Sequence, residues 1–203
     1  MHPYPAFRQR SEADALAFAR DRGFGVLVVN GAEGPLAAHV PFEIDAEGAS
    51  LMLHLARSNP MLRGGLPAQG VMIVSGPDAY VSPDWYGVPD QVPTWNYVSV
   101  HLRGALEVMP AETLRAHLDR VAAGFEARLA PKPPWLADKM TPGVLERMMR
   151  AILPVRLAVA AVHGTVKLNQ NKTDEARAGA AAGIDAARLG LAAGEIARRM
   201  RDG

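Results

Sequence analysis

Six stretches of apolar and β-branched residues, separated by polar turns, predict six β-strands. They cover residues 24–29, 36–42, 51–55, 71–75, 97–108 and 155–167. Asn30-Gly31 is strong turn chemistry between the first two. Because no helical pattern separates the first three strands, the spacing predicts an antiparallel meander rather than strand–helix–strand units.

Helical spacing appears before the first strand, between the last two strands and at the end of the chain. Residues 12–20 predict a short helix with Ser11 as its N-cap. Pro60, which follows Ser58 and Asn59, is typical of the first turn of another short helix. The clearest helix covers residues 110–125, with an apolar face made of Leu114, Leu118, Val121, Ala122 and Phe125.

Further helices are predicted over 135–140, 144–152 and 173–200. In the last of these we expect breaks at Gly183, Gly190 and Gly194. Six strands with helices before and after the final one indicate a mainly β (α+β) chain: a small antiparallel barrel that carries peripheral helices.

Residues 80–96 hold two of the three tryptophans, two of the four tyrosines and three prolines. Each aromatic side chain can bury a large area, so a loop this rich in them should pack against something flat. The candidates are a second subunit, a ring-shaped ligand, or both. A structureless loop of this length is uncommon in a compact domain unless it is functional.

Composition removes several classes of function. The chain has 203 residues, 49% hydrophobic content and no cysteine, which excludes disulfides, thiolate chemistry and cysteine-ligated metals. Its net charge of +1 gives no overall field that favours nucleic acid or membrane. No apolar run approaches membrane-spanning length and the N-terminus lacks a signal-peptide pattern, so we expect a cytoplasmic protein.

Three polar groups could carry chemistry, and each has a plainer explanation. His39 and His54 could ligate a metal, but no further ligand stands at the right spacing, so they could instead donate hydrogen bonds to a phosphate or a flavin ring. Arg57, Ser58 and Asn59 could bind an anion at a helix start, or simply cap that helix.

The third group is the run from Lys167 to Lys172, which includes Gln170 and Asn171. It could hold a phosphate or a polar ring edge, or be a solvated turn with Asn171 as the N-cap of the C-terminal helix. No nucleophile–base pair, dinucleotide fingerprint or phosphate-binding loop is present, and no residue is predicted to be catalytic.

Several segments together resemble the PaiB family of FMN-binding negative transcriptional regulators, which belongs to the flavin split-barrel (pyridoxamine-phosphate-oxidase-like) superfamily. The matching segments are HPYPAF, AAHVPF, LHLARSNP, SGPDAYVSPDWY, VPTWNYVSVHLRG and GTVKLNQNK, in the family's order over almost the whole chain.

The resemblance implies a six-stranded split β-barrel, a homodimer, and FMN bound in a groove where the two subunits meet. It implies an FMN-binding domain over residues 1–172, with a helical insertion at about 110–152, and a C-terminal helical extension over 173–203. It also implies cofactor contacts from His39, Pro41, Phe42, His54, Ala56, Arg57, Ser58, Asn59, Trp95, Asn96 and Tyr97, with Lys167, Gln170 and Asn171 as additions.

Other functions stay open at this stage. One is a flavin-dependent oxidoreductase acting on a small molecule, in which the flavin would carry the chemistry. Another is haem binding through His39, His54 or His101. DNA binding is supported only by the family label and by Arg198, Arg199 and Arg201, for which a solvated helix end is the plainer explanation.

Overall fold

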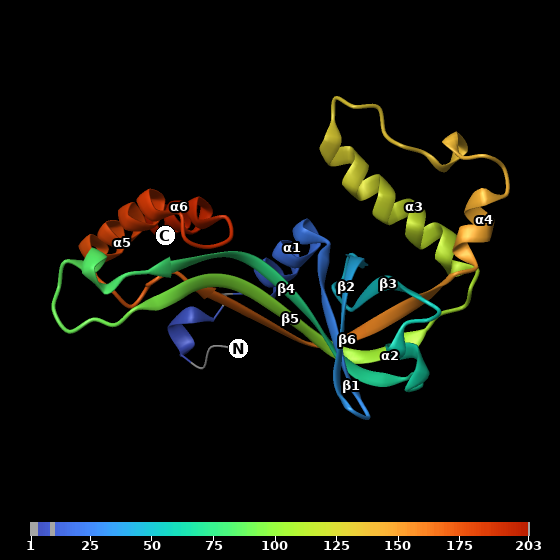
Figure 1. The fold of residues 1–203 in the computed structure, drawn as a ribbon, viewed down its shortest axis with the longest axis horizontal. Coiled ribbons are helices and arrows are strands. Elements are labelled where there is room, and N and C mark those ends of the chain that lie inside the picture. Colours follow the sequence, from blue (N-terminus) through green and yellow to red (C-terminus); the bar gives the residue numbers. More distant parts are fainter. Residues whose placement is uncertain (1–3, 9–10, 203) are drawn as a thin grey trace. The chain divides into compact units, whose positions relative to one another are not determined.

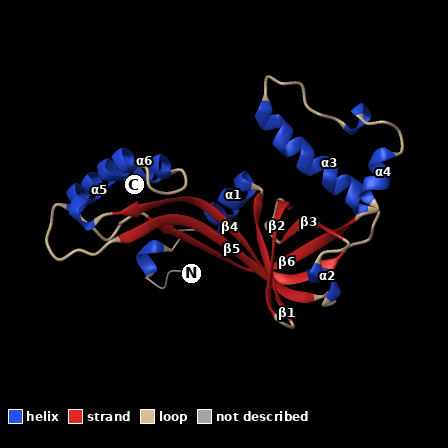
Figure 2. Cartoon of the chain, viewed as in Figure 1, coloured by secondary structure: helices blue, strands red, loops and turns tan. Residues whose placement is uncertain are grey.

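The computed structural model describes residues 4–8 and 11–202, and it contains the six predicted strands. They are β1 (Phe24–Gly31), β2 (Gly34–Ile44), β3 (Ser50–Ala56), β4 (Ala68–Val81), β5 (Thr94–Val108) and β6 (Ile152–Lys167). Figures 1 and 2 label these strands. They neighbour one another in the closed order β1-β2-β3-β6-β5-β4. The register is antiparallel between β1 and β2, β1 and β4, β2 and β3, and β3 and β6. The predicted six-stranded antiparallel fold is confirmed.

The helices are α1 (Glu12–Arg22), α2 (Pro60–Arg63), α3 (Thr113–Glu126), α4 (Val144–Met149), α5 (Asp174–Ala187) and α6 (Ala193–Asp202). Four segments are short 3-10 helices: η1 (Pro5–Phe7), η2 (Pro83–Tyr86), η3 (Ala127–Leu129) and η4 (Ala137–Lys139). Ser11 caps α1 as predicted, because its Oγ accepts from the backbone N–H of Asp14 at 3.0 Å. None of the helices in the described residues is both long and apolar enough to span a bilayer.

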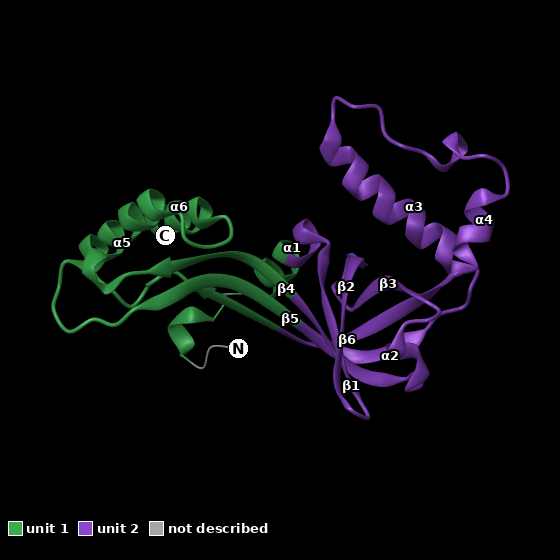
Figure 3. Cartoon of the chain, in the orientation of Figure 1, with its two compact units in different colours: residues 1–18, 74–101, 163–203 green, residues 19–73, 102–162 purple. Residues whose placement is uncertain are grey.

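The chain divides into two compact units (Figure 3). Unit 1 comprises residues 1–18, 74–101 and 163–203, and unit 2 comprises residues 19–73 and 102–162. The sequences of β4, β5 and β6 each continue from one unit into the other. The domain boundaries expected from the family resemblance, at residue 172 and around the insertion, stay a prediction.

The core of unit 2 follows the two-residue period of its strands. In β3, Leu51, Leu53 and Leu55 are buried, whereas Met52 and His54 alternate with them on the opposite face. Helix α3 contacts β2 and β3. The side chain of His54 therefore lies on the strand face opposite the buried leucines.

Unit 1 has its own core beneath its C-terminal helices. Ala180, Ile184, Ile196 and Met200 from α5 and α6 are buried in one cluster with residues of β4, β5 and η2. Trp85 of η2 packs against this cluster and lies over Gly183. The alanine-rich composition of residues 173–200 is what lets the two helices pack closely here.

Several element boundaries differ from the sequence prediction. Strand β4 continues to Val81 and β5 begins at Thr94, so the predicted aromatic loop 80–96 is mostly strand ends and the 3-10 turn η2. The predicted helix 135–140 is only the short turn η4, and α4 stops at Met149 because β6 begins at Ile152. Gly183 and Gly194 lie inside α5 and α6, and only the segment containing Gly190 interrupts the helix.

Candidate functional site

The residues predicted to hold a phosphate lie where β3 ends and α2 begins, in unit 2. Asn59 is the N-cap of α2, and its side chain accepts from the backbone N–H of Met61 at 3.0 Å. Pro60 occupies the first turn, as predicted from the sequence. Capping uses only the oxygen Oδ1 of Asn59, so its Nδ2 group stays available as a donor beside Arg57 and Ser58.

Arg57 is exposed but held in place. Its Nε donates to the carbonyl oxygen of Arg150 at 2.6 Å, and its backbone N–H donates to the carbonyl oxygen of Ala151 at 2.9 Å. Within the described residues, the terminal guanidinium nitrogens of Arg57 and the hydroxyl of Ser58 have no hydrogen-bond partner. A tethered arginine with free donors next to a free hydroxyl fits an anionic group such as a phosphate.

The other predicted residues of unit 2 follow the alternation of β2. Val40 and Phe42 are buried in the core, whereas His39 is exposed with its ring 6.3 Å from that of Phe24. Pro41, on the same strand, is half-buried, and Ala56 at the end of β3 is exposed. No group of three or more potential metal ligands occurs in the part of the chain that the structure describes.

His54 belongs to a hydrogen-bonded chain of four side chains, which we call the histidine relay (His54, His117, Glu43 and Arg120). Nδ1 of His54 lies 3.2 Å from Nε2 of His117, and Nδ1 of His117 lies 2.8 Å from Oε1 of Glu43. Arg120 then donates to both oxygens of Glu43, at 2.9 and 2.8 Å. The relay joins β3, α3 and β2 in one line of polar contacts.

Burial and charge act together on this relay. The side chain of His117 is completely buried, and that of Glu43 is 23% exposed. Burial of Glu43 raises the pKa of its carboxyl group, but hydrogen bonds from Arg120 and His117 outweigh it and leave that pKa below its usual value of 4.5. Burial, with a smaller contribution from His117, lowers the pKa of His54. At neutral pH, Glu43 is therefore a carboxylate and His54 is uncharged.

The sequence prediction missed His117, Glu43 and Arg120. The predicted apolar face of the helix 110–125 included Phe125, which is 36% exposed, and omitted His117, which is fully buried. His117 lies three residues after the buried Leu114, so helical spacing alone could have placed it on the inner face. Its partner Glu43 lies on a distant strand, and nothing local in the sequence points to it.

The predicted residues at the start of β5 lie in unit 1. Trp95 is 46% exposed, and its ring stands 6.0 Å from that of Tyr80, which also contacts Trp85. Asn96 points the other way and is completely buried, with its Nδ2 donating to Sδ of Met200 at 3.3 Å. Tyr97 is half-buried on the same strand. Only Trp95 of the three offers a broad exposed surface.

The remaining predicted residues follow β6. Lys167 bonds Oγ1 of Thr94, and burial lowers the pKa of its ammonium group. Gln170 folds back on its own turn: it accepts from the backbone N–H of Leu168 at 2.7 Å and donates to the carbonyl oxygen of Val166. Asn171 is exposed, and it is not the N-cap of α5 as expected. That role belongs to Thr173, whose hydroxyl accepts from the N–H of Ala176.

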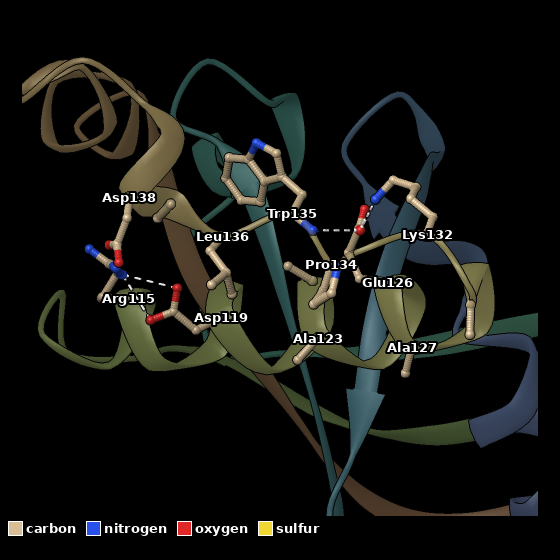
Figure 4. Close-up of a pocket in the computed structure, with 13 residues that line it drawn as sticks. Arg115, Asp119, Ala123, Glu126, Ala127, Lys132, Pro134, Trp135, Leu136 and Asp138 are labelled. Atoms are coloured by element: carbon tan, nitrogen blue, oxygen red, sulfur yellow. Dashed lines mark hydrogen bonds and ion pairs between the residues drawn. The ribbon is translucent and has the colours of Figure 1, made fainter.

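A cavity of about 550 Å³ lies within unit 2, between α3 and residues 130–138 (Figure 4). Alanines of α3 line one side, and Pro134, Trp135 and Leu136 line the other. Four of its five charged groups form two pairs, Arg115 with Asp119 and Lys132 with Glu126, and Asp138 is the fifth. None of the fourteen residues predicted to contact the cofactor lines this cavity.

Comparison with known proteins places the chain in a family. Residues 1–161 match the family model described as "Putative FMN-binding domain". The chain is 28% identical over 171 residues to the protease synthase and sporulation protein PAI 2 of Bacillus subtilis, covering 83% of this chain and 81% of that protein. This relative is the PaiB protein of Bacillus subtilis. The resemblance to the PaiB family is therefore confirmed.

Solved structures show the same fold. The FAD and haem binding protein of Mycobacterium smegmatis aligns with a TM-score of 0.58 at 18% identity, over 91% of this chain and 82% of that one. The flavocytochrome Anf3 of Azotobacter vinelandii aligns with a TM-score of 0.57 at 18% identity, over 82% and 72%. The fold shared with these two structures is the six-stranded antiparallel split barrel.

The match over most of the chain identifies a flavin as its cofactor. With the free donors at the end of β3 and the fold shared with the two structures, it leads to one assignment: this chain is a flavin-binding split-barrel protein that belongs to the "Putative FMN-binding domain" family.

Proposed function

We propose that this protein is a homodimeric FMN-binding protein, in which Arg57 and Ser58 hold the FMN phosphate and His54 contacts the polar edge of the flavin ring. The observation that carries the proposal is the pair of unused donors on a tethered arginine and its neighbouring serine. An FMN phosphate carries negative charge and accepts several hydrogen bonds, which is the chemistry these groups offer.

The homodimer is supported by the exposed apolar side chains around the start of β5. Val92 is 73% exposed and Trp95 is 46% exposed, next to prolines that stiffen the segment. Exposed aromatic anchors of this kind are enriched in protein interfaces. A second copy of the chain that packs on Trp95 would bury this exposed indole.

A regulatory role on DNA remains a separate prediction. The basic cluster that the sequence offered for it is occupied by ion pairs: Arg198 and Arg199 bind Glu195, and Arg201 binds Asp185. These paired arginines give DNA binding no support, so the proposal is limited to flavin binding and dimerisation.

The test of the phosphate site compares FMN with riboflavin, which lacks the phosphate. Arg57→Ala should weaken FMN binding by about 1.5–3 kcal/mol, the scale of hydrogen bonds to a charged group, while riboflavin binding stays nearly unchanged. Flavin-fluorescence titration measures both affinities. The matched control is Arg63→Ala, which removes a basic residue from the last turn of α2 and should leave the FMN preference intact. Equal losses for both flavins in Arg57→Ala would place the phosphate elsewhere.

A further inference from the structure

The direction of the hydrogen bonds in the histidine relay can be worked out from its charged end. Glu43 is a carboxylate held by Arg120, so it can only accept hydrogen bonds. Nδ1 of His117, 2.8 Å from Oε1 of Glu43, must therefore carry a proton and donate it. With its single N–H on Nδ1, His117 presents its other ring nitrogen, Nε2, as an acceptor.

The proton position on His54 follows from the accepting nitrogen of His117. Its Nδ1 lies 3.2 Å from the accepting Nε2 of His117, so Nδ1 of His54 carries the proton of that bond. A neutral imidazole has a single N–H, so Nε2 of His54 is left with a bare lone pair. Among the described residues nothing donates to this nitrogen, and the ring is only partly buried. Histidine in water favours the opposite tautomer, with its proton on Nε2.

We propose that His117 and Glu43 are positioning residues which preset Nε2 of His54 as a hydrogen-bond acceptor for an N–H group of the bound flavin. The inference rests on the proposed flavin site, and it names what selects the orientation of the ring there. An oxidised flavin ring has one N–H, at N3, on an edge that otherwise presents acceptors. An acceptor at His54 selects that N–H, and a donor in the same place would select its neighbouring carbonyl oxygens instead.

The geometry of α3 and the strands makes this arrangement rigid. His117 is completely buried, so no water competes for its ring nitrogens. Glu43 is fixed by a two-pronged contact with Arg120, which is the orientation-specific form of such a pair. His117 and Glu43 do not touch the ligand in this account; they act only by fixing which nitrogen of His54 is protonated.

The first experiment reads the tautomer directly in protein free of flavin. Two-bond ¹H–¹⁵N correlation NMR of histidine-labelled protein at pH 8 should show both His54 and His117 protonated on Nδ1 and bare on Nε2. His54→Gln assigns the His54 signals by their loss, and His163→Gln, in unit 1, should leave both sets unchanged. A proton on Nε2 of His54, or rapid exchange between the two forms, would overturn the proposal.

The second experiment releases the relay while keeping His54. In His117→Phe, the His54 signals should shift to the Nε2-protonated form, and flavin affinity should fall between about 2- and 10-fold, the range of one hydrogen bond. If this variant does not fold, the wild-type spectrum still decides. The Nδ1 tautomer in a protein that binds no flavin would leave the relay standing and refute the proposed function. Flavin binding by a protein whose His54 is protonated on Nε2 would leave the proposed function standing and refute the role of the relay.

Discussion

Glu43 is a carboxylate that accepts hydrogen bonds from His117 and Arg120. Its ionisation therefore contributes to the free energy of unfolding. Its folded-state pKa lies below 4.5, because the hydrogen bonds from Arg120 and His117 favour the carboxylate more than burial opposes it. A carboxyl group of this kind stabilises the fold above its unfolded pKa. That contribution is lost as the pH falls through the folded pKa.

Glu43→Gln should therefore lower the free energy of unfolding by about 1.5 kcal/mol at pH 7, and the difference from wild type should shrink below about pH 4. Urea denaturation at a series of pH values measures both. The matched control is Glu107→Gln, which removes a carboxylate paired with Arg156 where both side chains are more than 40% exposed. A surface pair of that kind contributes only about 0–1 kcal/mol. A constant difference between wild type and Glu43→Gln at all pH values would contradict the account.

Single residues were predictable where their signal is local. Ser58 or Asn59 before Pro60 predicted the start of α2, and the structure shows Asn59 as the cap and Pro60 in the first turn. His117 carried a usable signal in its spacing from Leu114, but its role depends on Glu43, which lies 74 residues away along the chain. Tertiary partners of that kind follow from strand and helix packing, which the pattern of one sequence does not specify.

At the scale of elements, the packing of η2 on α5 determines where glycine is required. A Cβ added to Gly183 would overlap the ring of Trp85, and one added to Gly179 would overlap the backbone of Trp85. Both glycines are therefore imposed by the close approach of η2. Neither interrupts α5, because helical backbone is available to glycine at a modest cost.

Gly183→Ala should destabilise the protein by about 1–3 kcal/mol, because the methyl group forces Trp85 out of its packed position. The matched control is Gly124→Ala in α3, where an added Cβ meets nothing within 4 Å. That substitution should stabilise the fold by about 0.5–1 kcal/mol through helix propensity alone. Thermal unfolding followed by circular dichroism measures both. Equal effects of the two substitutions would show that Trp85 does not pack on α5.

The sequence predicted all six strands but misjudged the segment after the fourth. Gly76-Pro77-Asp78 has turn chemistry, yet β4 runs through it to Val81. Gly76 is needed there because a Cβ would press on Phe18 and Val98. The sequence alone does not distinguish a glycine required by close packing from a glycine required by a turn. The fourth strand, predicted to end at residue 75, therefore continues to Val81.

At the scale of the whole molecule, the proposed homodimer predicts a mass and a residue on which that mass depends. Trp95→Glu places a charge on the exposed indole surface and should convert a dimer, at twice the chain mass of 21.7 kDa, to a monomer. Light scattering after size-exclusion chromatography measures the mass. Trp135→Glu, at another exposed tryptophan, is the control and should leave the mass unchanged. A wild-type protein that elutes as a monomer with and without FMN would refute the homodimer.

The fold as a whole was predictable only in part from physical pattern. Alternation and turn residues predicted antiparallel strands with peripheral helices, because these signals are local. The pairing of β3 with β6 joins segments about 100 residues apart, and the expectation of a split barrel came from the family resemblance. The free donors of Arg57 and Ser58 were named from the sequence, but the contact that tethers Arg57 to Arg150 could not be.

The most direct test of the central claim is the visible absorption spectrum of the purified protein after equilibration with FMN and removal of the excess. The account predicts a yellow protein with the flavin absorption bands, about one flavin released per chain on denaturation, and clear loss of this flavin in Arg57→Ala. Colourless wild-type protein that retains no FMN under these conditions would contradict it.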